Sequence, residues 1–193
     1  MWDEKVLINK CLAGDHAAIT GLYKTFSPVL YPICLRYAAG RDDANDLLHD
    51  CFIRIIHSLS DFRFEGSFEG WMKRITVNTA INQYRKSKRD QTISVEASMP
   101  VEDEAPDVLE HLQAQEIIAL ISTLPEGYRQ VFNLFAIEGY KHKEIAEMLG
   151  ITESTSKSQF FKAKKWLIIK LNDLYPQESV VNQRFTDEQG YGR

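Results

Sequence analysis

The chain has 193 residues, enough for one or two small domains, with a formal net charge of −4 and a pI of about 5.8. This charge excludes a protein that is basic overall. The charges are segregated along the chain, however, because no Lys or Arg lies between Arg89 and Arg129. Two basic segments therefore flank an acidic middle, which indicates a polyelectrolyte partner. The charged start lacks a signal-peptide apolar region, and no apolar run reaches membrane-spanning length. We expect a cytoplasmic protein without direct membrane insertion.

Helical periodicity dominates the chain, which predicts an all-α fold of two small helical domains joined by a flexible acidic linker. The three cysteines form no CxxC pair, so we expect buried thiols of a reducing compartment without a metal or redox role: Cys11, Cys34 and Cys51. A first helix is expected over residues 3–13. Gly14 would close it and Asp15 would cap the next helix. Pro28, at a first helical position, predicts a separate helix over residues 27–39.

The longest clear helix follows Gly40, with Asp42 or Asp43 as its N-cap, and ends near Leu59. One face is a continuous apolar stripe that we expect to be buried: Leu47, Leu48, Cys51, Phe52, Ile55, Ile56 and Leu59. Another face is acidic with one apolar side chain: Asp43, Asp46, Asp50, Ile53 and His57. Such a face can dock a basic partner protein, although an ordinary hydrated face with one stray Ile is the simpler interpretation.

Residues 61–89 carry aromatic side chains in their first half and basic side chains in their second half. A helix is expected to start near Phe68. At about 100° per residue, three of its side chains share one flank: Arg74, Asn78 and Arg85. Guanidinium and amide groups suit phosphates and base edges. Aromatic rings beside a basic helix are what a single-stranded nucleic acid requires, although a basic helix end is often only a solvated face.

The aromatic residues of this stretch divide into two groups. Phe68 and Trp71 lie at helical spacing with Ile75, so we expect both in the core. Phe62 and Phe64 lie in or beside the loop before the helix and are the better candidates for exposure.

Residues 91–107 change character, with two prolines and four acids among the last six positions, which predicts a linker. Helical pattern resumes over residues 108–122. A Leu-Pro pair at 124–125 then breaks it, and a helix over residues 126–138 follows. The last residues, 176–193, are polar and are expected to be disordered.

Residues 139–171 predict a helix-turn-helix. A short helix has an apolar inner face, Gly150 supplies a tight turn, Thr152 caps a second helix, and that helix has its own inner stripe. The inner residues are Ile145, Ala146, Leu149, Phe160, Ala163 and Leu167. The second helix offers short polar groups for base edges and lysines for phosphates: Ser154, Thr155, Ser158, Lys157 and Lys162. A ligand-free helical hairpin is the competing interpretation.

These signals together resemble one family, the extracytoplasmic-function (group 4) sigma factors of bacterial RNA polymerase. Short motifs carry the resemblance in order: GD at 14–15, D-A-x-D-L-x-x-D-x-F at 43–52, F-R-x-E-x-S-F-x-x-W at 62–71, R-I-x-x-N at 74–78, L-P at 124–125, E-I-A-x-x-L-G-I at 144–151 and S-T-x-K-S at 154–158. The resemblance spans about residues 3–172. No motif is specific alone, but their ordered combination is.

The resemblance implies a sigma factor that binds core RNA polymerase, directs it to −35/−10 promoter DNA and helps melt the −10 element. It implies a region 2-like domain over residues 1–90, an acidic linker over 91–107 and a region 4-like helix-turn-helix domain over 108–175, followed by the tail over 176–193. It also implies an anti-sigma partner, and it requires neither a cofactor nor a metal, nor any catalytic residue.

The resemblance also assigns site residues. Polymerase binding would use Asp43, Asp46, Asp50 and Ile53. Contacts to the −10 element would use Phe64, Glu65, Ser67, Arg74, Asn78 and Arg85. Contacts to the −35 element would use Ser154, Thr155, Lys157, Ser158, Gln159 and Lys162.

The chain departs from the family pattern at four positions. Gln159 stands where the family usually has Arg, and Ser156 stands where a buried Val is usual. Phe64 and Gly66 replace the small residues usual in the loop that holds the flipped −10 base. We therefore expect a weaker phosphate contact at Gln159 and a looser second helix around Ser156.

Two other functions compete with this one. A stand-alone helix-turn-helix regulator of duplex DNA would explain the end of the chain but not residues 61–89. A metal phosphohydrolase would use Asp46, His49 and Asp50, which lie close enough on one helix to ligate a divalent ion.

Overall fold

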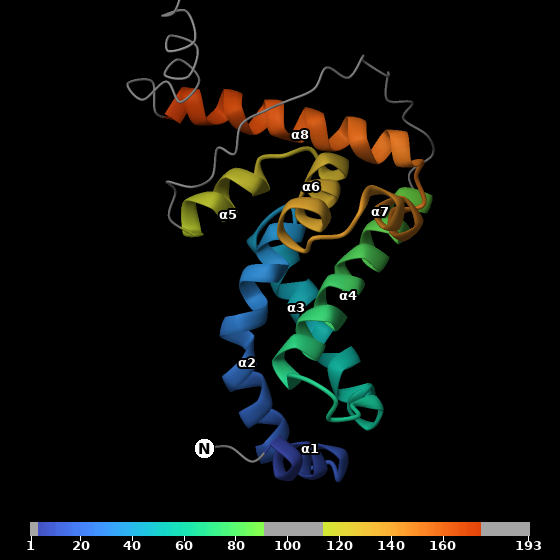
Figure 1. The fold of residues 1–193 in the computed structure, drawn as a ribbon. Helices are drawn as coiled ribbons and strands as arrows, with labels where there is room; N and C mark the ends of the chain where they lie inside the picture. Colours follow the sequence, from blue (N-terminus) through green and yellow to red (C-terminus); the bar gives the residue numbers. More distant parts are fainter. Residues whose placement is uncertain (1–3, 91–113, 175–193) are drawn as a thin grey trace, which may run out of the picture. The chain divides into compact units, whose positions relative to one another are not determined.

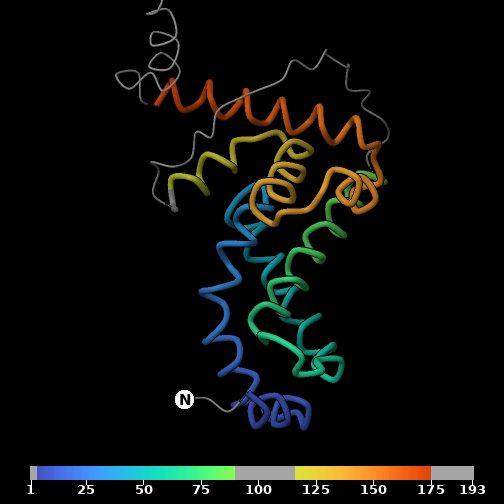
Figure 2. Tube along the Cα trace, viewed as in Figure 1, coloured from blue at the N-terminus to red at the C-terminus, as the bar shows by residue number. Residues whose placement is uncertain are grey.

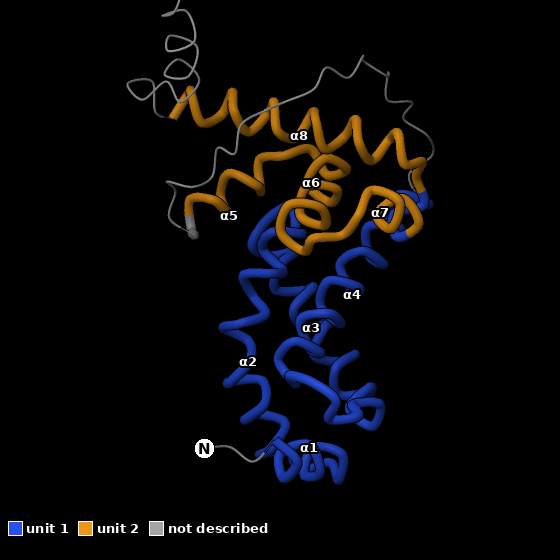
Figure 3. The backbone as a smooth tube through the Cα atoms, viewed as in Figure 1, with its two compact units in different colours: residues 1–95, 148–150 blue, residues 96–147, 151–193 orange. Residues whose placement is uncertain are grey.

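A computed structural model describes residues 4–90 and 114–174 of the chain. Helices make up all the regular structure of these residues, as the prediction of an all-α fold required (Figure 1). The chain divides into two compact units, residues 1–95 with 148–150 and residues 96–147 with 151–193 (Figure 3). The linker predicted over 91–107 and the tail predicted over 176–193 lie outside the described residues.

The first two helices are separated by the turn that the sequence predicts. Helix α1 (Glu4–Leu12) ends at Gly14, whose φ of 78° is the left-handed conformation that glycine adopts without steric cost. The carboxylate of Asp15 accepts hydrogen bonds from the amides of Ala17 (2.8 Å) and Ala18 (3.2 Å), which caps helix α2 (His16–Tyr37). Both predicted caps are confirmed.

Helix α2 is continuous through both of its prolines, so the prediction of a separate helix beginning at Pro28 is wrong. A proline within a helix removes one backbone hydrogen bond and normally kinks or breaks the helix. Here the residues after Pro28 are buried on the same helix: Leu30, Ile33, Cys34 and Tyr37. Packing of this apolar face against α3 and α4 offsets the lost hydrogen bond.

Helix α3 (Arg41–His57) begins two or three residues earlier than predicted, with Gly40 at the N-cap and no side-chain cap. Asp42 and Asp43 therefore lie in the first turn, where they complement the helix dipole without capping the helix. The predicted apolar stripe is confirmed by the burial of Leu47, Leu48, Cys51, Phe52 and Ile55. A short 3₁₀ turn, η1 (Leu59–Asp61), then leads toward α4.

Helix α4 (Phe68–Asp90) completes the first unit by packing against both α2 and α3 (Figure 2). The three cysteines of the unit are buried, as predicted. The thiol of Cys51 lies 4.0 Å from the carbonyl oxygen of Thr76 on α4. A hydrogen bond with Cys51, together with burial, raises the pKa of Cys34, so this thiol stays protonated.

The second unit contains α5 (Ala114–Ser122), α6 (Glu126–Phe132), the π-turn η2 (Asn133–Ile137), most of α7 (His142–Leu149) and α8 (Glu153–Leu174). Of the helix predicted over 108–122, residues 108–113 lie outside the described residues. The helix predicted over 126–138 has α geometry only to Phe132 and then widens into the π-turn. The core joins α5, α6 and α8 through Leu120, Ile121, Leu124, Phe132, Ala163, Leu167 and Leu171. In the parts of the chain that the structure covers, no helix has the length and apolar character needed to span a membrane.

Candidate nucleic-acid interface

The loop between η1 and α4 carries an exposed aromatic ring against a buried aromatic cluster. Phe64 is 43% exposed, whereas Phe62 is only 8% exposed. Their ring centroids lie 4.8 Å apart, and the Phe62 ring also packs against Phe68 at 5.0 Å and Trp71 at 5.4 Å. The predicted exposure of Phe64 is confirmed, and so is the burial of Phe68. The predicted exposure of Phe62 is wrong, because its ring is packed among three others.

The backbone of Phe64 has a φ of 58°, and no other described residue except glycine has a positive φ. The left-handed conformation costs a residue with a Cβ atom about 1–2 kcal/mol. Such strain persists only where the surroundings fix the conformation, and it occurs often at binding sites. The same loop presents Glu65 and Ser67 as exposed residues. Ser67 also accepts a hydrogen bond from the amide of Gly70 at 3.2 Å, which fixes the start of α4.

The flank of α4 predicted to face nucleic acid lies outward over most of its length. Arg74 and Asn78 are exposed, and Arg85 is half-buried. On the same helix Lys73 forms an ion pair with Glu69 at 2.7 Å, one turn away. Guanidinium and amide groups therefore follow the exposed aromatic ring along the chain, in the combination that suits an unpaired strand.

Helix α3 presents the acidic face that the sequence predicts. Asp43, Asp46 and Asp50 are exposed, and Ile53 is 43% exposed beside them. The carboxylate of Asp50 accepts a hydrogen bond of 2.8 Å from the Nε2 of Gln83 on α4, which orients one acid of the face. This face is accessible, its acids form no ion pair within the described part of the chain, and it therefore suits a basic partner.

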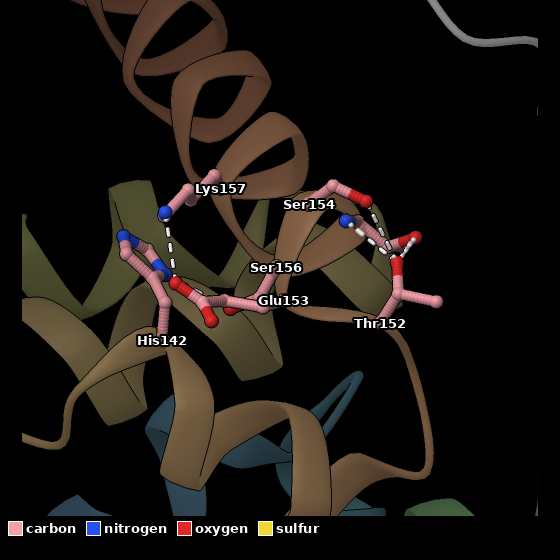
Figure 4. Close-up of polar contacts among 7 residues, drawn as sticks. His142, Thr152, Glu153, Ser154, Ser156 and Lys157 are labelled. Carbon is pink, nitrogen blue, oxygen red and sulfur yellow. Dashed lines mark hydrogen bonds and ion pairs between the residues drawn. The ribbon is translucent and has the colours of Figure 1, made fainter.

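The predicted turn between two helices lies between α7 and α8. Gly150 has a φ of 69°, and the amide of Ile151 bonds to the carbonyl of Ala146 at 3.0 Å, as in a Schellman turn. The Oγ1 of Thr152 accepts a hydrogen bond of 3.1 Å from the amide of Thr155, so the predicted N-cap of α8 is confirmed (Figure 4). The buried inner residues of α7 are the three predicted: Ile145, Ala146 and Leu149.

Five of the six residues predicted to contact duplex DNA have surface on α8. Ser154 and Lys157 are exposed, whereas Thr155, Ser158 and Lys162 are half-buried. The Lys157 ammonium lies 2.8 Å from the Glu153 carboxylate, a pair that lowers the pKa of Glu153 (Figure 4). Exposed pairs of this kind contribute little, so Lys157 can exchange Glu153 for a phosphate.

The sixth residue, Gln159, is only 8% exposed, so it presents little surface, and its contact with DNA stays a prediction. Gln159 follows Ser158 by about 100° around the helix, which turns it away from the outer face. Its neighbour on the inner face, Ser156, is completely buried, in agreement with the buried position that the resemblance assigns to it.

A partly buried hydrogen bond joins the two helices around the turn. The Nδ1 of His142, at the start of α7, lies 2.9 Å from the Oγ of Ser156 on α8 (Figure 4). The imidazole also stacks on the ring of Phe135, with 4.3 Å between centroids. Burial and the nearby Lys157 lower the pKa of His142, so the neutral imidazole is favoured. The sequence predicted neither this bond nor the role of Ser156 in it, because the two residues are separated by the turn.

The metal-site alternative has no supporting geometry. Within residues 4–90 and 114–174, no group of three His, Cys, Asp or Glu side chains lies close enough to hold a metal ion. Asp50 instead accepts its hydrogen bond from Gln83.

The two units thus define a class of protein with an exposed aromatic loop before a basic helix in one part and a helix-turn-helix in the other. A family model described as "Sigma-70 region 2" matches residues 22–90, and one described as "Sigma-70, region 4" matches residues 114–167. Together these matches cover more than half of the chain. The chain therefore belongs to the sigma-70 family, and several of its curated relatives are named extracytoplasmic-function sigma factors.

The similar curated proteins include the extracytoplasmic-function sigma factor SigE of Mycolicibacterium smegmatis. It is 30% identical over 165 residues, which cover 80% of this chain and 63% of that relative. This chain thus spans just under two thirds of the length of that relative. The sigma-E factor of Escherichia coli is 26% identical over 183 residues, covering 89% of this chain and 95% of the relative.

Among solved structures, the chain is similar to the sigma factor RpoE of Bartonella quintana, which was crystallised with the anti-sigma factor NepR. The match has a TM-score of 0.45 and 20% identity, and it covers 79% of this chain and 96% of that one.

Proposed function

We propose that this chain is a sigma factor that binds core RNA polymerase, directs it to promoters with −35 and −10 elements and helps open the −10 element. The observation that carries the proposal is the presence of two different DNA-facing elements in one member of the sigma-70 family. One is a loop with an exposed, strained aromatic ring beside a basic helix. The other is a capped helix after a glycine turn.

The two elements suit two states of DNA. The capped start of α8 offers Ser154, Thr155 and Ser158 to base edges in a duplex, with Lys157 and Lys162 toward phosphates. The loop and α4 offer Phe64, Glu65, Ser67, Arg74, Asn78 and Arg85 to a strand that has left the duplex. Accordingly we assign residues 1–90 to −10 opening, 91–107 to a linker, 108–175 to −35 recognition and 176–193 to a tail.

The partners follow from the same assignment. Core polymerase would bind the acidic face of α3, where Asp43, Asp46 and Asp50 surround Ile53. An anti-sigma factor would control access to that polymerase. The protein would act in the cytoplasm, where the polymerase works, without a cofactor and without catalysing a reaction of its own.

Run-off transcription tests the proposal directly. Core polymerase is combined with the purified chain and a library of candidate promoters, and core polymerase alone is the control. We expect discrete transcripts that require both the chain and a promoter with two elements. Absence of any chain-dependent transcript would contradict the proposal.

The sequence also raised a stand-alone regulator of duplex DNA, which would explain the helix-turn-helix, but the match to sigma-70 region 2 argues against it. Such a regulator gives no role to the loop around Phe64 or to the acidic face of α3. Tight, sequence-specific binding of duplex DNA by the chain without polymerase would support the regulator.

A further inference from the structure

Lys5, in the first helix of the chain, lies beside the loop that carries Phe64. The ammonium of Lys5, in the first turn of α1, lies 5.4 Å from the centroid of the Phe64 ring, within the range of a cation–π contact. Helix α1 packs against η1, which directly precedes the loop, so the fold fixes this approach (Figure 1). Lys5 belongs to none of the motifs that carry the family resemblance.

The Phe64 ring packs against another ring of the protein and is also partly exposed. It contacts the buried Phe62, whose own ring packs against Phe68 and Trp71. Its backbone has a positive φ, a conformation that persists where the surroundings hold it, and 43% of the residue nevertheless remains exposed. A rigid ring of this kind can stack with an unpaired base, and stacking of this type tolerates any base because every base has a π-face.

An unpaired base is always attached to a phosphate, so a stacking ring gains from a cation next to it. Lys5 is the exposed cation that the structure places at the Phe64 ring. A lysine ammonium is a compact charge with rotatable donors on a flexible stem, which suits a mobile strand. The local charge of the acidic neighbour Glu65 makes a further cation useful here, since Glu65 alone would repel the backbone.

We propose that Lys5 is a −10 strand-binding residue, whose ammonium contacts the DNA phosphate beside the base that stacks on Phe64. This inference rests on the proposed function. It assigns α1 a part in opening the promoter, and it makes the Lys5–Phe64 contact the resting arrangement of the site. On binding, the ammonium exchanges or shares its contact with the ring for one with the phosphate.

The test uses holoenzyme reconstituted from core polymerase and the full chain, with forked promoter DNA whose non-template −10 strand is unpaired. Binding is measured over a series of salt concentrations for wild type, Lys5→Met, Lys5→Arg and Lys10→Met. Lys10 is the matched control, because it is an exposed lysine in the last turn of the same helix. A fully paired fragment carrying the −35 element alone is the DNA control.

We expect Lys5→Met to bind forked DNA about two- to ten-fold more weakly at low salt and to lose about 0.7 from the salt slope, as for one single-strand phosphate contact. Lys5→Arg should retain the wild-type slope, and Lys10→Met should match wild type. Binding to the −35 fragment should not change in any variant.

Equal affinity and slope for wild type and Lys5→Met would overturn the inference. Weaker binding with an unchanged slope would also overturn it, since Lys5 would then only position Phe64. A wild-type holoenzyme that does not prefer forked DNA to paired DNA would instead refute the proposed function, so the two failures are distinguishable.

Discussion

At the scale of single residues, Ser156 shows how a departure from a family pattern can be compensated. A buried hydroxyl without a partner would destabilise the second unit, but Ser156 lies within hydrogen-bonding distance of His142 across the turn. The sequence led us to expect that Ser156 loosens the second helix, because it did not reveal His142 as the hydrogen-bond partner. The bond joins the start of α7 to α8, so it stabilises the geometry that presents α8 to DNA.

Loss of this bond should therefore have a measurable cost. Ser156→Ala should lower the free energy of unfolding of the second unit by about 1 kcal/mol, the usual contribution of one hydrogen bond with a partner left unsatisfied. Ser158→Ala is the control, because its hydroxyl bonds only to the carbonyl of Thr155 within the same helix. Urea unfolding resolved by hydrogen exchange of α8 amides measures both, and equal stabilities would contradict the role given to Ser156.

His142 predicts a pH dependence with a definite sign. Burial and Lys157 lower its pKa from 6.5 in the folded chain, while Glu153 opposes this shift. Below about pH 6.5 the unfolded chain therefore binds more protons than the folded chain, and stability falls as the pH decreases toward the folded pKa. His142→Gln should flatten this loss between about pH 7 and pH 5. An unchanged pH profile of unfolding in the variant would exclude His142 as its source.

The residue scale also shows where sequence reasoning succeeded and failed. Periodicity separated Phe68 from Phe64 correctly, because helical spacing marks a buried stripe. It misplaced Phe62, which lies outside the helix yet fills a cluster of three other rings. Likewise, the Lys5–Phe64 contact depends on how α1 packs in three dimensions, so no local pattern could indicate it.

At the scale of elements, caps and turns were predictable, whereas helix continuity was not. Gly14, Asp15, Gly150 and Thr152 act as predicted because each satisfies a local requirement of one helix end. Pro28 was misleading, because burial of the following apolar face overrides a local helix-breaking preference. Tertiary packing of an amphipathic face, rather than propensity, provides most of the stability of such helices.

The turn between α7 and α8 gives a test at this scale. Gly150→Ala should destabilise the second unit by about 1–2 kcal/mol, because its φ of 69° is unfavourable for a residue with a Cβ atom. Gly150→Asn should cost less, since Asn tolerates this conformation. Gly66→Ala is the control, with no positive φ and no atom within 4 Å of an added Cβ. Equal thermal stabilities of the Gly150→Ala and Gly66→Ala chains would contradict this account of the turn.

At the scale of the whole molecule, charge is divided by function. The acidic face of α3 and the basic flank of α4 belong to one unit, and the lysines of α8 belong to the other. With its charges separated in this way, a protein with a net charge of −4 can bind DNA. The electrostatic field of each charged surface attracts its own partner.

The acidic face predicts a selective loss of polymerase binding. Asp46→Lys combined with Asp50→Lys should weaken binding to core polymerase by about tenfold or more and leave the fold intact, because both side chains are exposed. Asn45→Lys, which adds positive charge at an exposed position about 100° around α3 from Asp46, serves as the control. Co-purification with core polymerase compares them, and equal retention of both variants would contradict the assignment of this face.

The central claim is that α8 acts on duplex DNA whereas the loop and α4 act on a strand leaving the duplex. Permanganate footprinting of unpaired thymines, combined with a binding assay for the closed complex, tests it most directly. Holoenzymes with Phe64→Ala or Asn78→Ala should bind the promoter in a closed complex yet show little thymine reactivity at the −10 element. A holoenzyme with Ser154→Ala and Lys157→Ala should bind the closed promoter more weakly. Wild-type reactivity in the Phe64→Ala and Asn78→Ala holoenzymes, with closed binding unaffected by the α8 changes, would contradict the claim.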